Sequence, residues 1–217
     1  MVEHVYRRAR AASLLDEVVV ATDDQRIADV VDRFGGTAVM THRHHLSGTD
    51  RLAEVAAALT SDIVVNIQGD EPTIAPETID SAVKQLLDRP QEVMSTLRRR
   101  ISDMADLSNP SVVKLVTDSS GFALYFTRSA VPFVRPGHLP PTFWKHLGLY
   151  GYRRSFLITL ASLEPTPLEQ AEGLEQLRAI EHGYRIITAE TMADAIGVDT
   201  PEDLERVRQL VGTAVKI

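Results

Sequence analysis

The sequence predicts an α/β protein with a mostly parallel sheet, helices on both faces and an antiparallel hairpin insertion. Short β-branched runs alternate with amphipathic helical stripes over residues 1–88, which is typical of parallel strands joined by crossover helices. Two strand patterns flank the turn Asp118-Ser119-Ser120-Gly121 and indicate the hairpin. The chain has 217 residues, 44% of them hydrophobic, so one domain can bury a sizeable core.

The elements of the first part follow from the spacing of apolar residues. Apolar residues three or four apart predict helices, and β-branched runs bounded by turn residues predict strands. In order, we expect a helix over 1–12, a strand over 18–21, a helix through 27–34, a strand over 37–40, a helix over 49–59, a strand over 63–67 and a helix through 79–87.

The second part begins with antiparallel strands. The hairpin strands cover 112–117 and 122–127, and a proline-rich loop follows. The segment KHLGLYGY, residues 145–152, predicts a further strand. We therefore place an antiparallel insertion at 109–152 within a single domain, 1–217.

Two capping patterns begin helices in the C-terminal part. Thr166 and Glu169 form a capping-box pattern before a helix that we expect to end at Gly183. The same pattern recurs from Thr200. Asp199 therefore lies at a helix N-terminus.

Two acids lie shortly after predicted strands. Asp70 comes after the strand over 63–67, and Asp199 comes after a short strand over 196–198. Ligands of open α/β sheets bind beyond the carboxyl ends of the strands, and Gln68-Gly69 allows a ligand to approach the backbone there. Two such carboxylates suit a Mg²⁺ ion that carries a nucleotide phosphate. The alternative is that Asp70 belongs to a turn and Asp199 only caps its helix.

The segment HLSGTDRLAEV is a second candidate site. Its exposed helix N-terminal amides, together with Arg51, could hold a base, ribose or phosphate. The alternative is simple helix capping by Ser47. The nearby histidines of HRHH lack the helical spacing of a metal site, so we interpret them as part of a polar loop.

A third cluster lies in the insertion and the helix after it. Cations and hydroxyl groups together would suit an acidic sugar, whereas each residue alone would be ordinary surface decoration. The members are Arg128, Lys145, His146, Tyr150, Glu175, Gln176 and Arg178.

Composition and the lack of certain sequence patterns argue against several functional classes. The net charge is −7, which disfavours a nucleic-acid partner held through phosphates. The absence of cysteine removes disulfide and thiolate chemistry and suits a reducing compartment. No apolar run reaches transmembrane length, and the first residues lack a signal-peptide core. No G-x-G-x-x-G follows a strand, which disfavours a Rossmann dehydrogenase. We expect a soluble, cytoplasmic protein without nucleic-acid or membrane partners.

Seven motifs carry a resemblance to a known family. They are HLSGTDRLAEV, VVNIQGDEP, NPSVVKLVTD, LYFTRSAVPF, KHLGLYGY, LEQAEGLEQLR and GVDTPEDLERV. In this order they resemble the 3-deoxy-manno-octulosonate (Kdo) cytidylyltransferases, the CMP-Kdo synthetases of lipopolysaccharide synthesis, from Met1 to about Leu210. QGDEP is shared with related cytidylyltransferases, whereas HLGLYGY with LEQLR is more specific to the Kdo enzymes.

The resemblance implies a nucleotide-diphospho-sugar transferase-like fold, a homodimer, and the reaction of CTP with Kdo to give CMP-Kdo and pyrophosphate. It also implies that 109–152 contributes to the sugar site and the dimer contacts. By matching motif, Asp70 and Asp199 would be Mg²⁺ ligands and catalytic. The nucleotide contacts would be Ser47, Gly48, Thr49, Arg51, Gln68 and Gly69, and the Kdo contacts would be Arg128, His146, Tyr150, Glu175 and Gln176.

The chain departs from the family at its start. Family members open with a strand and a loop rich in Gly, Arg and Lys, whereas this chain begins at the helix that follows them. Either the reading frame continues upstream of Met1 or the chain is a fragment, and we favour the first. We expect the chain as written to be poorly active and prone to aggregation, which robust CTP turnover would contradict.

Two other functions are compatible with the sequence. One is a related CMP-acidic-sugar synthetase, such as a CMP-sialic acid synthetase, which HLGLYGY and LEQLR disfavour. The other is a nucleotide-binding remnant without catalysis, which the missing opening segment favours.

Overall fold

The computed structural model describes residues 1–45, 47–193, 197–198 and 200–214, with side chains up to 210. Helices and strands alternate through most of it, as the spacing of apolar residues predicts. The elements in chain order are α1 (Val2–Arg10), β1 (Val20–Thr22), α2 (Gln25–Arg33), β2 (Ala38–Met40), α3 (Gly48–Ala57), β3 (Ile63–Asn66), α4 (Pro76–Asp88), β4 (Met94–Arg100), α5 (Met104–Ser108), β5 (Lys114–Thr117), β6 (Ala123–Thr127), β7 (Trp144–Arg153), α6 (Arg154–Ser162), α7 (Pro167–Glu172), α8 (Gln176–Glu181), β8 (Ile187–Glu190) and α9 (Pro201–Ala214).

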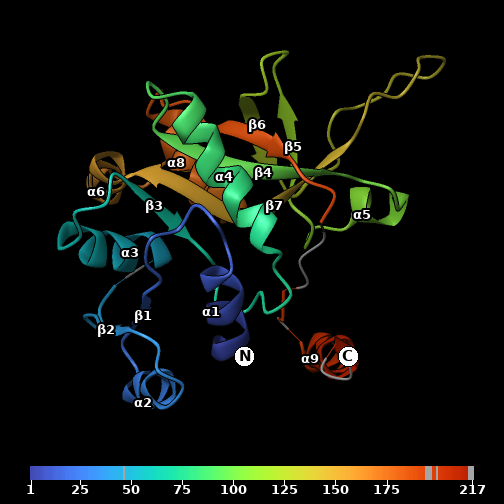
Figure 1. Cartoon of the computed structure of the whole chain (residues 1–217). Helices are drawn as coiled ribbons and strands as arrows, with labels where there is room; N and C mark the ends of the chain where they lie inside the picture. The colour runs from blue at the N-terminus through green and yellow to red at the C-terminus, as the bar shows by residue number, and fades with distance from the viewer. Residues whose placement is uncertain (46, 194–196, 199, 215–217) are drawn as a thin grey trace.

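The larger sheet has six strands arranged around β7 (Figure 1). One edge of β7 pairs with β4, and the other pairs with β3 at one end and with β5 at the other. β8 extends the sheet beyond β4, and β6 extends it beyond β5. Four strands, β3, β4, β5 and β8, point the same way, and β6 and β7 run opposite to them. The expected α/β class and the expected antiparallel hairpin are both confirmed.

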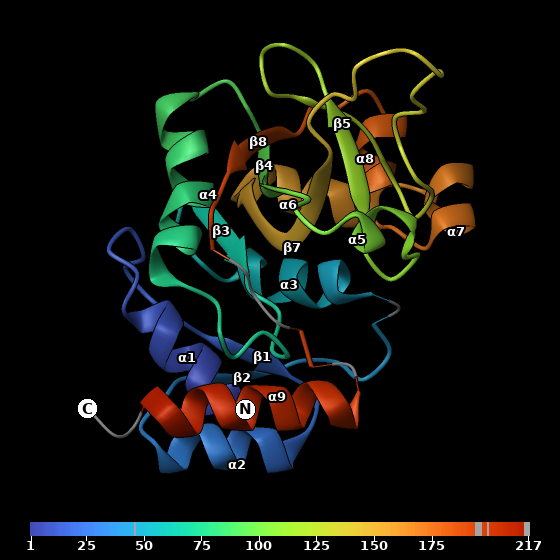
Figure 2. The same cartoon turned by 90° about the vertical axis from the view of Figure 1, so that its right-hand side faces the viewer.

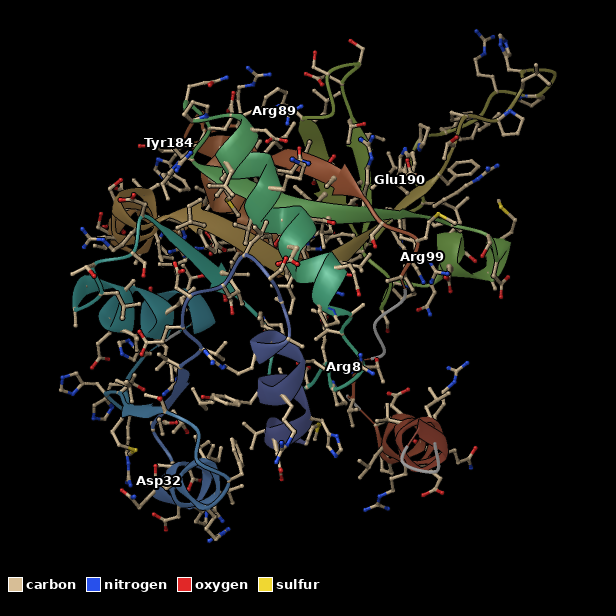
Figure 3. The ribbon with its side chains drawn as sticks, in the orientation of Figure 1. Arg8, Asp32, Arg89, Arg99, Tyr184 and Glu190 are labelled. Carbon is tan, nitrogen blue, oxygen red and sulfur yellow. The ribbon has the colours of Figure 1, made fainter. Side chains whose placement is uncertain are left out.

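A second sheet consists of β1 and β2, which pair in parallel. It lies with α2 at the end of the molecule opposite Arg89, the C-cap residue of α4, as the labels on Asp32 and Arg89 show (Figure 3). In the part of the chain that the structure describes, no β-ladder joins this pair of strands to the six-stranded sheet.

Helices cover both faces of the larger sheet (Figure 2). One face carries α4, and its core includes Ile79, Leu97 and Leu149. The opposite face carries α6 and α8, and its core includes Phe126 and Leu157. Burial of these apolar side chains supplies the main force that holds both layers to the sheet.

The helix expected to run from Pro167 to Gly183 is in fact two helices, so that prediction was wrong. α7 ends at Gly173, which adopts a left-handed conformation (φ 63°, ψ 44°) that glycine accommodates without steric cost. α8 begins three residues later. The predicted capping at both starts is present, since Thr166 N donates to Glu169 Oε2 (3.1 Å) and Asp203 N donates to Thr200 Oγ1 (3.2 Å).

Close packing between α4 and the sheet depends on Gly151 of β7. A Cβ there would lie 2.6 Å from Ser95 Oγ and 3.4 Å from Ala82 O. The space that glycine leaves allows Ser95 Oγ to donate a hydrogen bond to Ala82 O (2.8 Å). Among the described residues, no helix is long and apolar enough to cross a membrane.

Candidate active site

A cavity of about 610 Å³ lies between β1 and β3. Residues of both strands line it, together with parts of α1 and α3. Four members of the predicted nucleotide set are among its lining residues: Gly48, Arg51, Gln68 and Gly69. The N-terminus of α3 and the segment after β3 therefore border the same space, which also extends along β3 to Ser61 and Asp62 at the other end of the strand.

The start of α3 is capped by its own sequence. Ser47 Oγ accepts a hydrogen bond from Asp50 N (3.1 Å), which is the capping interaction expected from the motif. Thr49 is buried, and its hydroxyl donates to Glu175 Oε2 (2.5 Å). This hydrogen bond joins a residue of the predicted nucleotide set to one of the predicted sugar set, although they lie far apart in sequence.

The guanidinium of Arg51 is fixed by two acceptors. Its Nη1 donates to Thr41 Oγ1 (2.6 Å) and lies 3.1 Å from Asp23 Oδ1. Thr41 and Asp23 follow β2 and β1 directly in the chain. Arg51 therefore connects α3 to the two-stranded sheet.

The segment after β3 forms a tight turn, in which Glu71 N donates to Gln68 O (3.3 Å). It lies over β7 at Gly148, where a Cβ would come within 3.8 Å of Glu71 Oε1 and 4.0 Å of Gln68 Cγ. Gly148 thus leaves room for the side chains of Gln68 and Glu71, which flank Gly69 and Asp70.

The carboxyl group of Glu71 has a raised pKa. Burial of its carboxyl group, and then the neighbouring charge of Asp70, raise its pKa to about 7. A second turn follows, in which Ile74 N donates to Glu71 O (3.2 Å). Glu71 therefore places a titratable carboxyl group beside the predicted metal ligand.

The proposed partner of Asp70 lies outside the described residues, because Asp199 is not among them, and neither is Ile196 of the short strand expected before it. The residue before Asp199 is described: Val198 N donates to Asp70 O (2.9 Å). The two segments therefore meet in space, although more than a hundred residues separate them in the chain.

The available donors fit a magnesium ion bound with a nucleotide. Among the described residues, no group of three or more His, Cys, Asp or Glu side chains could hold a metal. Mg²⁺ in nucleotide sites typically takes one or two carboxylates, with phosphate oxygens and water completing its coordination. Asp70 on a strand-end turn is compatible with that mode and would not form an all-protein cage.

Aromatic side chains line up along β7. The ring of His146 lies 5.1 Å from that of Phe126 and 5.2 Å from that of Tyr150, and the rings of Tyr150 and Tyr152 are 5.9 Å apart. Thr96 Oγ1 is 2.9 Å from His146 Nε2. These contacts fix the orientation of the imidazole.

Burial favours the uncharged forms of His146 and Tyr150. It lowers the pKa of His146 to about 3, so the imidazole is neutral at neutral pH. Burial, and then the charges of Tyr152, Glu175 and Glu71, raise the pKa of Tyr150. Both side chains therefore act as neutral hydrogen-bonding groups.

The start of α8 completes the cluster. Glu175 contacts Thr49 as described, and Tyr152 also shares a hydrogen bond with Thr49. Gln176 is 5% exposed, and its Nε2 has no hydrogen-bond partner within the described residues. A buried amide without a partner is costly unless a ligand or water completes it, which favours a binding role.

Two cations predicted for the sugar side are engaged elsewhere. The Nε of Arg128 donates to Glu172 O (2.9 Å) and its Nη1 donates to Pro110 O (3.0 Å). Arg178 forms a buried ion pair with Glu169. Within the described part of the chain, none of these hydrogen bonds reaches the row of rings on β7.

The structure brings several residues to the site that the sequence did not predict there. Asp23 and Thr41 contact Arg51, Thr96 contacts His146, and Tyr152 contacts Thr49. Asp23 follows a strand just as Asp70 does, so the same strand-end rule would have found it.

The lowered pKa of His146 predicts an acid-dependent loss of stability. Its pKa is depressed in the folded state, so the unfolded state binds the proton more readily, and stability falls as pH drops below the unfolded value of about 6.5. When the pH is lowered from 7.5 to 5, the free energy of unfolding should decrease less for His146→Gln than for the unmutated protein. We expect a difference of ~1 kcal/mol between the two decreases, after allowing for the partial exposure of His146. Urea titrations at the two pH values measure this difference. His138→Gln, on an exposed loop, is the matched control, and equal behaviour of the two variants would contradict the assignment.

A family profile and individual relatives both show similarity to cytidylyltransferases. The family profile described as Cytidylyltransferase matches residues 1–186. A 3-deoxy-manno-octulosonate cytidylyltransferase from Pelobacter propionicus is 52% identical over 221 residues, covering 96% of this chain and 86% of the relative. The same enzyme from Geotalea uraniireducens is 54% identical over 217 residues, covering 95% and 86%.

Solved structures of related enzymes superimpose on this chain. A CMP:2-keto-3-deoxy-manno-octonic acid synthetase complexed with CTP superimposes with a TM-score of 0.93 and 42% identity, covering 98% of this chain and 88% of that one. A 4-diphosphocytidyl-2C-methyl-D-erythritol synthase from Anaerococcus prevotii has a TM-score of 0.63 and 11% identity, covering 97% and 88%. The second likeness concerns the fold alone.

Proposed function

The chain belongs to the cytidylyltransferase family, among its 3-deoxy-manno-octulosonate enzymes, and we propose from this that it transfers CMP from CTP to Kdo, releasing pyrophosphate. The reaction supplies activated Kdo for lipopolysaccharide synthesis. The observation that carries the proposal is the meeting of two residue sets, one beside the cavity and one along β7, through the Thr49–Glu175 hydrogen bond. We place the reaction in the cytoplasm, where its nucleotide substrate is found.

In this proposal the cavity side binds the nucleotide. The solved relative was complexed with CTP. Gly48 and Gly69 expose backbone close to the ligand, and Arg51 and Gln68 present hydrogen-bond donors beside them. Ser47 and Thr49 support this arrangement through the cap of α3 and the hydrogen bond to Glu175.

The metal assignment is part of the proposal. Asp70 and Asp199 would hold Mg²⁺, and the contact between Val198 and Asp70 supports their proximity. When bound, the ion would neutralise charge on the α-phosphate. Asp70 would then act through its carboxylate, and the buried, partly protonated Glu71 beside it would limit the total negative charge.

The sugar would bind along β7 and the start of α8. Neutral His146 and Tyr150 would contact its hydroxyl groups, and Glu175 and Gln176 would complete the polar surface. Arg128 would attract the sugar carboxylate, provided that it leaves its bonds to Glu172 and Pro110.

The chemistry is an in-line displacement at phosphorus. The anomeric hydroxyl of Kdo forms a bond to the α-phosphorus, the bond from that phosphorus to the bridging oxygen breaks, and pyrophosphate leaves with the bonding electrons. The hydroxyl proton passes to solvent. Positioning of the two substrates and stabilisation of developing charge supply most of the acceleration.

The test is a paired-substrate assay. CTP and Mg²⁺ are combined with Kdo or with N-acetylneuraminate, and pyrophosphate and the nucleotide sugar are both measured. We expect CMP-Kdo as the dominant product, and the ratio between the two sugars decides the assignment, whatever the absolute rate. Preference for N-acetylneuraminate would overturn it, and Mg²⁺-dependent CTP binding without either product would favour the remnant hypothesis.

A homodimer is also part of the proposal. In the loop after β6, Phe133 is 84% exposed and Leu139 is 93% exposed. We propose that these two side chains contribute apolar contacts between subunits, since the buried core of such an interface is enriched in aromatic and apolar residues. Light scattering after size exclusion measures the state, and a monomer at micromolar concentration would contradict the proposal.

A further inference from the structure

The contacts of Arg51 link three elements that the sequence separates. Arg51 lies in the first turn of α3, Asp23 follows β1, and Thr41 follows β2. β1 and β2 pair in parallel, with Thr22 opposite Met40, so the residues that follow them are neighbours at the carboxyl ends of the two strands. Thr41 N also donates to Thr22 O (2.9 Å), which extends the pairing to the residue that contacts Arg51.

The environment of this contact differs from that of a surface ion pair. Thr41 is 8% exposed, and the side chains of Arg51 and Asp23 are 24% and 36% exposed. Both contacts use the same nitrogen, Nη1. Among the described residues, the side-chain contacts of Arg51 use Nη1 and leave Nε and Nη2 without a side-chain acceptor. Arg51 also lines the cavity, together with Gly48, Gln68 and Gly69.

The neighbouring acid, Asp24, has a different role. Its side chain accepts from Arg26 N (2.8 Å) to cap α2, and it pairs with the exposed guanidinium of Arg26. The two consecutive acids therefore make different contacts. Asp24 caps α2, and Asp23 pairs with Arg51 on α3.

We infer that Asp23 and Thr41 are positioning residues for Arg51, which hold its guanidinium in the orientation that meets the nucleotide. The inference rests on the proposed role of Arg51 in CTP binding and extends it to two residues outside the nucleotide set. An arginine side chain has many rotamers, and ordering it on binding weakens affinity. An acceptor at each strand end orders the side chain beforehand and leaves the Nε and Nη2 edge of the planar guanidinium for the ligand.

The test compares Asp23→Asn with Asp24→Asn. Both variants remove one negative charge, and asparagine at position 24 still caps a helix. We expect Asp23→Asn to raise the Kd and KM for CTP about 10-fold while kcat changes less than about 2-fold, because the loss is one of preorganised binding. Asp24→Asn should change none of the three by more than about 2-fold. Thr41→Val should act in the same direction as Asp23→Asn, and thermal unfolding checks that each variant folds.

A double-mutant cycle separates positioning from other effects. In an Arg51→Ala background, Asp23→Asn should have no further effect on CTP affinity, because its target is gone. If Arg51→Ala weakens CTP binding and Asp23→Asn does not, or if the two effects are additive, the inference is overturned and the proposed function stands. If Arg51→Ala binds CTP as the unmutated protein does, Asp23 has nothing to position and the inference also fails. Absence of CTP binding by the unmutated protein would instead overturn the proposed function.

Discussion

Replacement of Asp70 by asparagine should reduce pyrophosphate release by on the order of 10²-fold or more while the protein folds normally. The amide keeps the shape of the side chain but removes the charge that the metal requires. The fold should tolerate the change, since the contact between Val198 and Asp70 uses only the main-chain oxygen. Release of pyrophosphate in the presence of CTP, Kdo and Mg²⁺ measures the effect, and circular dichroism checks the fold.

A matched control lies at the end of α4, outside the lining of the cavity. Asp88 is exposed and pairs with Lys84 (3.1 Å), so Asp88→Asn removes the same charge without altering the segment after β3. It should retain turnover within about 2-fold. Dependence of CTP binding on Mg²⁺ gives a second measurement, which Asp70→Asn should lose. Unchanged pyrophosphate release by Asp70→Asn would end its assignment as a metal ligand.

Replacement of Glu169 by glutamine should produce a large loss of stability. Glu169 and Arg178 form a two-bond ion pair, with Nε to Oε2 at 2.8 Å and Nη2 to Oε1 at 2.6 Å, and their side chains are only 9% and 10% exposed. Glutamine leaves the guanidinium buried without its counter-charge, which typically costs 3–5 kcal/mol. The charges of Asp50 and Glu175 also act on Arg178, so we expect about 3 kcal/mol.

The measurement is the free energy of unfolding in denaturant, together with a fall in Tm of roughly 6–12 °C for a chain of this size. Glu3→Gln provides the comparison. Glu3 pairs with Arg7 on α1, where both side chains are well exposed, and losing that pair should cost less than about 0.5 kcal/mol. Equal stabilities of the two variants would show that the buried Glu169–Arg178 pair contributes no more to the free energy of unfolding than the exposed pair.

Local patterns predicted most elements of the fold because each is encoded in a few consecutive residues. The strand over 63–67 and the helix after Ser47 appear where spacing and capping place them. The helix after Thr166 was predicted too long, because a glycine within a helical pattern can be tolerated or can end the helix. In the fold Gly173 ends it, with a left-handed conformation that sequence spacing does not reveal.

The candidate site was predictable to the extent that strand ends define it. Gln68 and Gly69 border the cavity as that rule requires. Contacts between distant segments were not predictable, because they depend on β7 pairing with both β3 and β4, and chain order does not specify that pairing. The neighbours of Thr49 and His146 follow from this arrangement.

The separation of β1 and β2 from the larger sheet has a dynamic consequence. Among the described residues, no β-ladder joins these two strands to the rest, so the pair can open on its own at a lower free energy than global unfolding, and its amide protons should exchange early. Arg51 and its two acceptors straddle this boundary. A nucleotide bound by Arg51 would therefore suppress the opening by mass action, and ligand affinity and local order at this end of the molecule would rise and fall together.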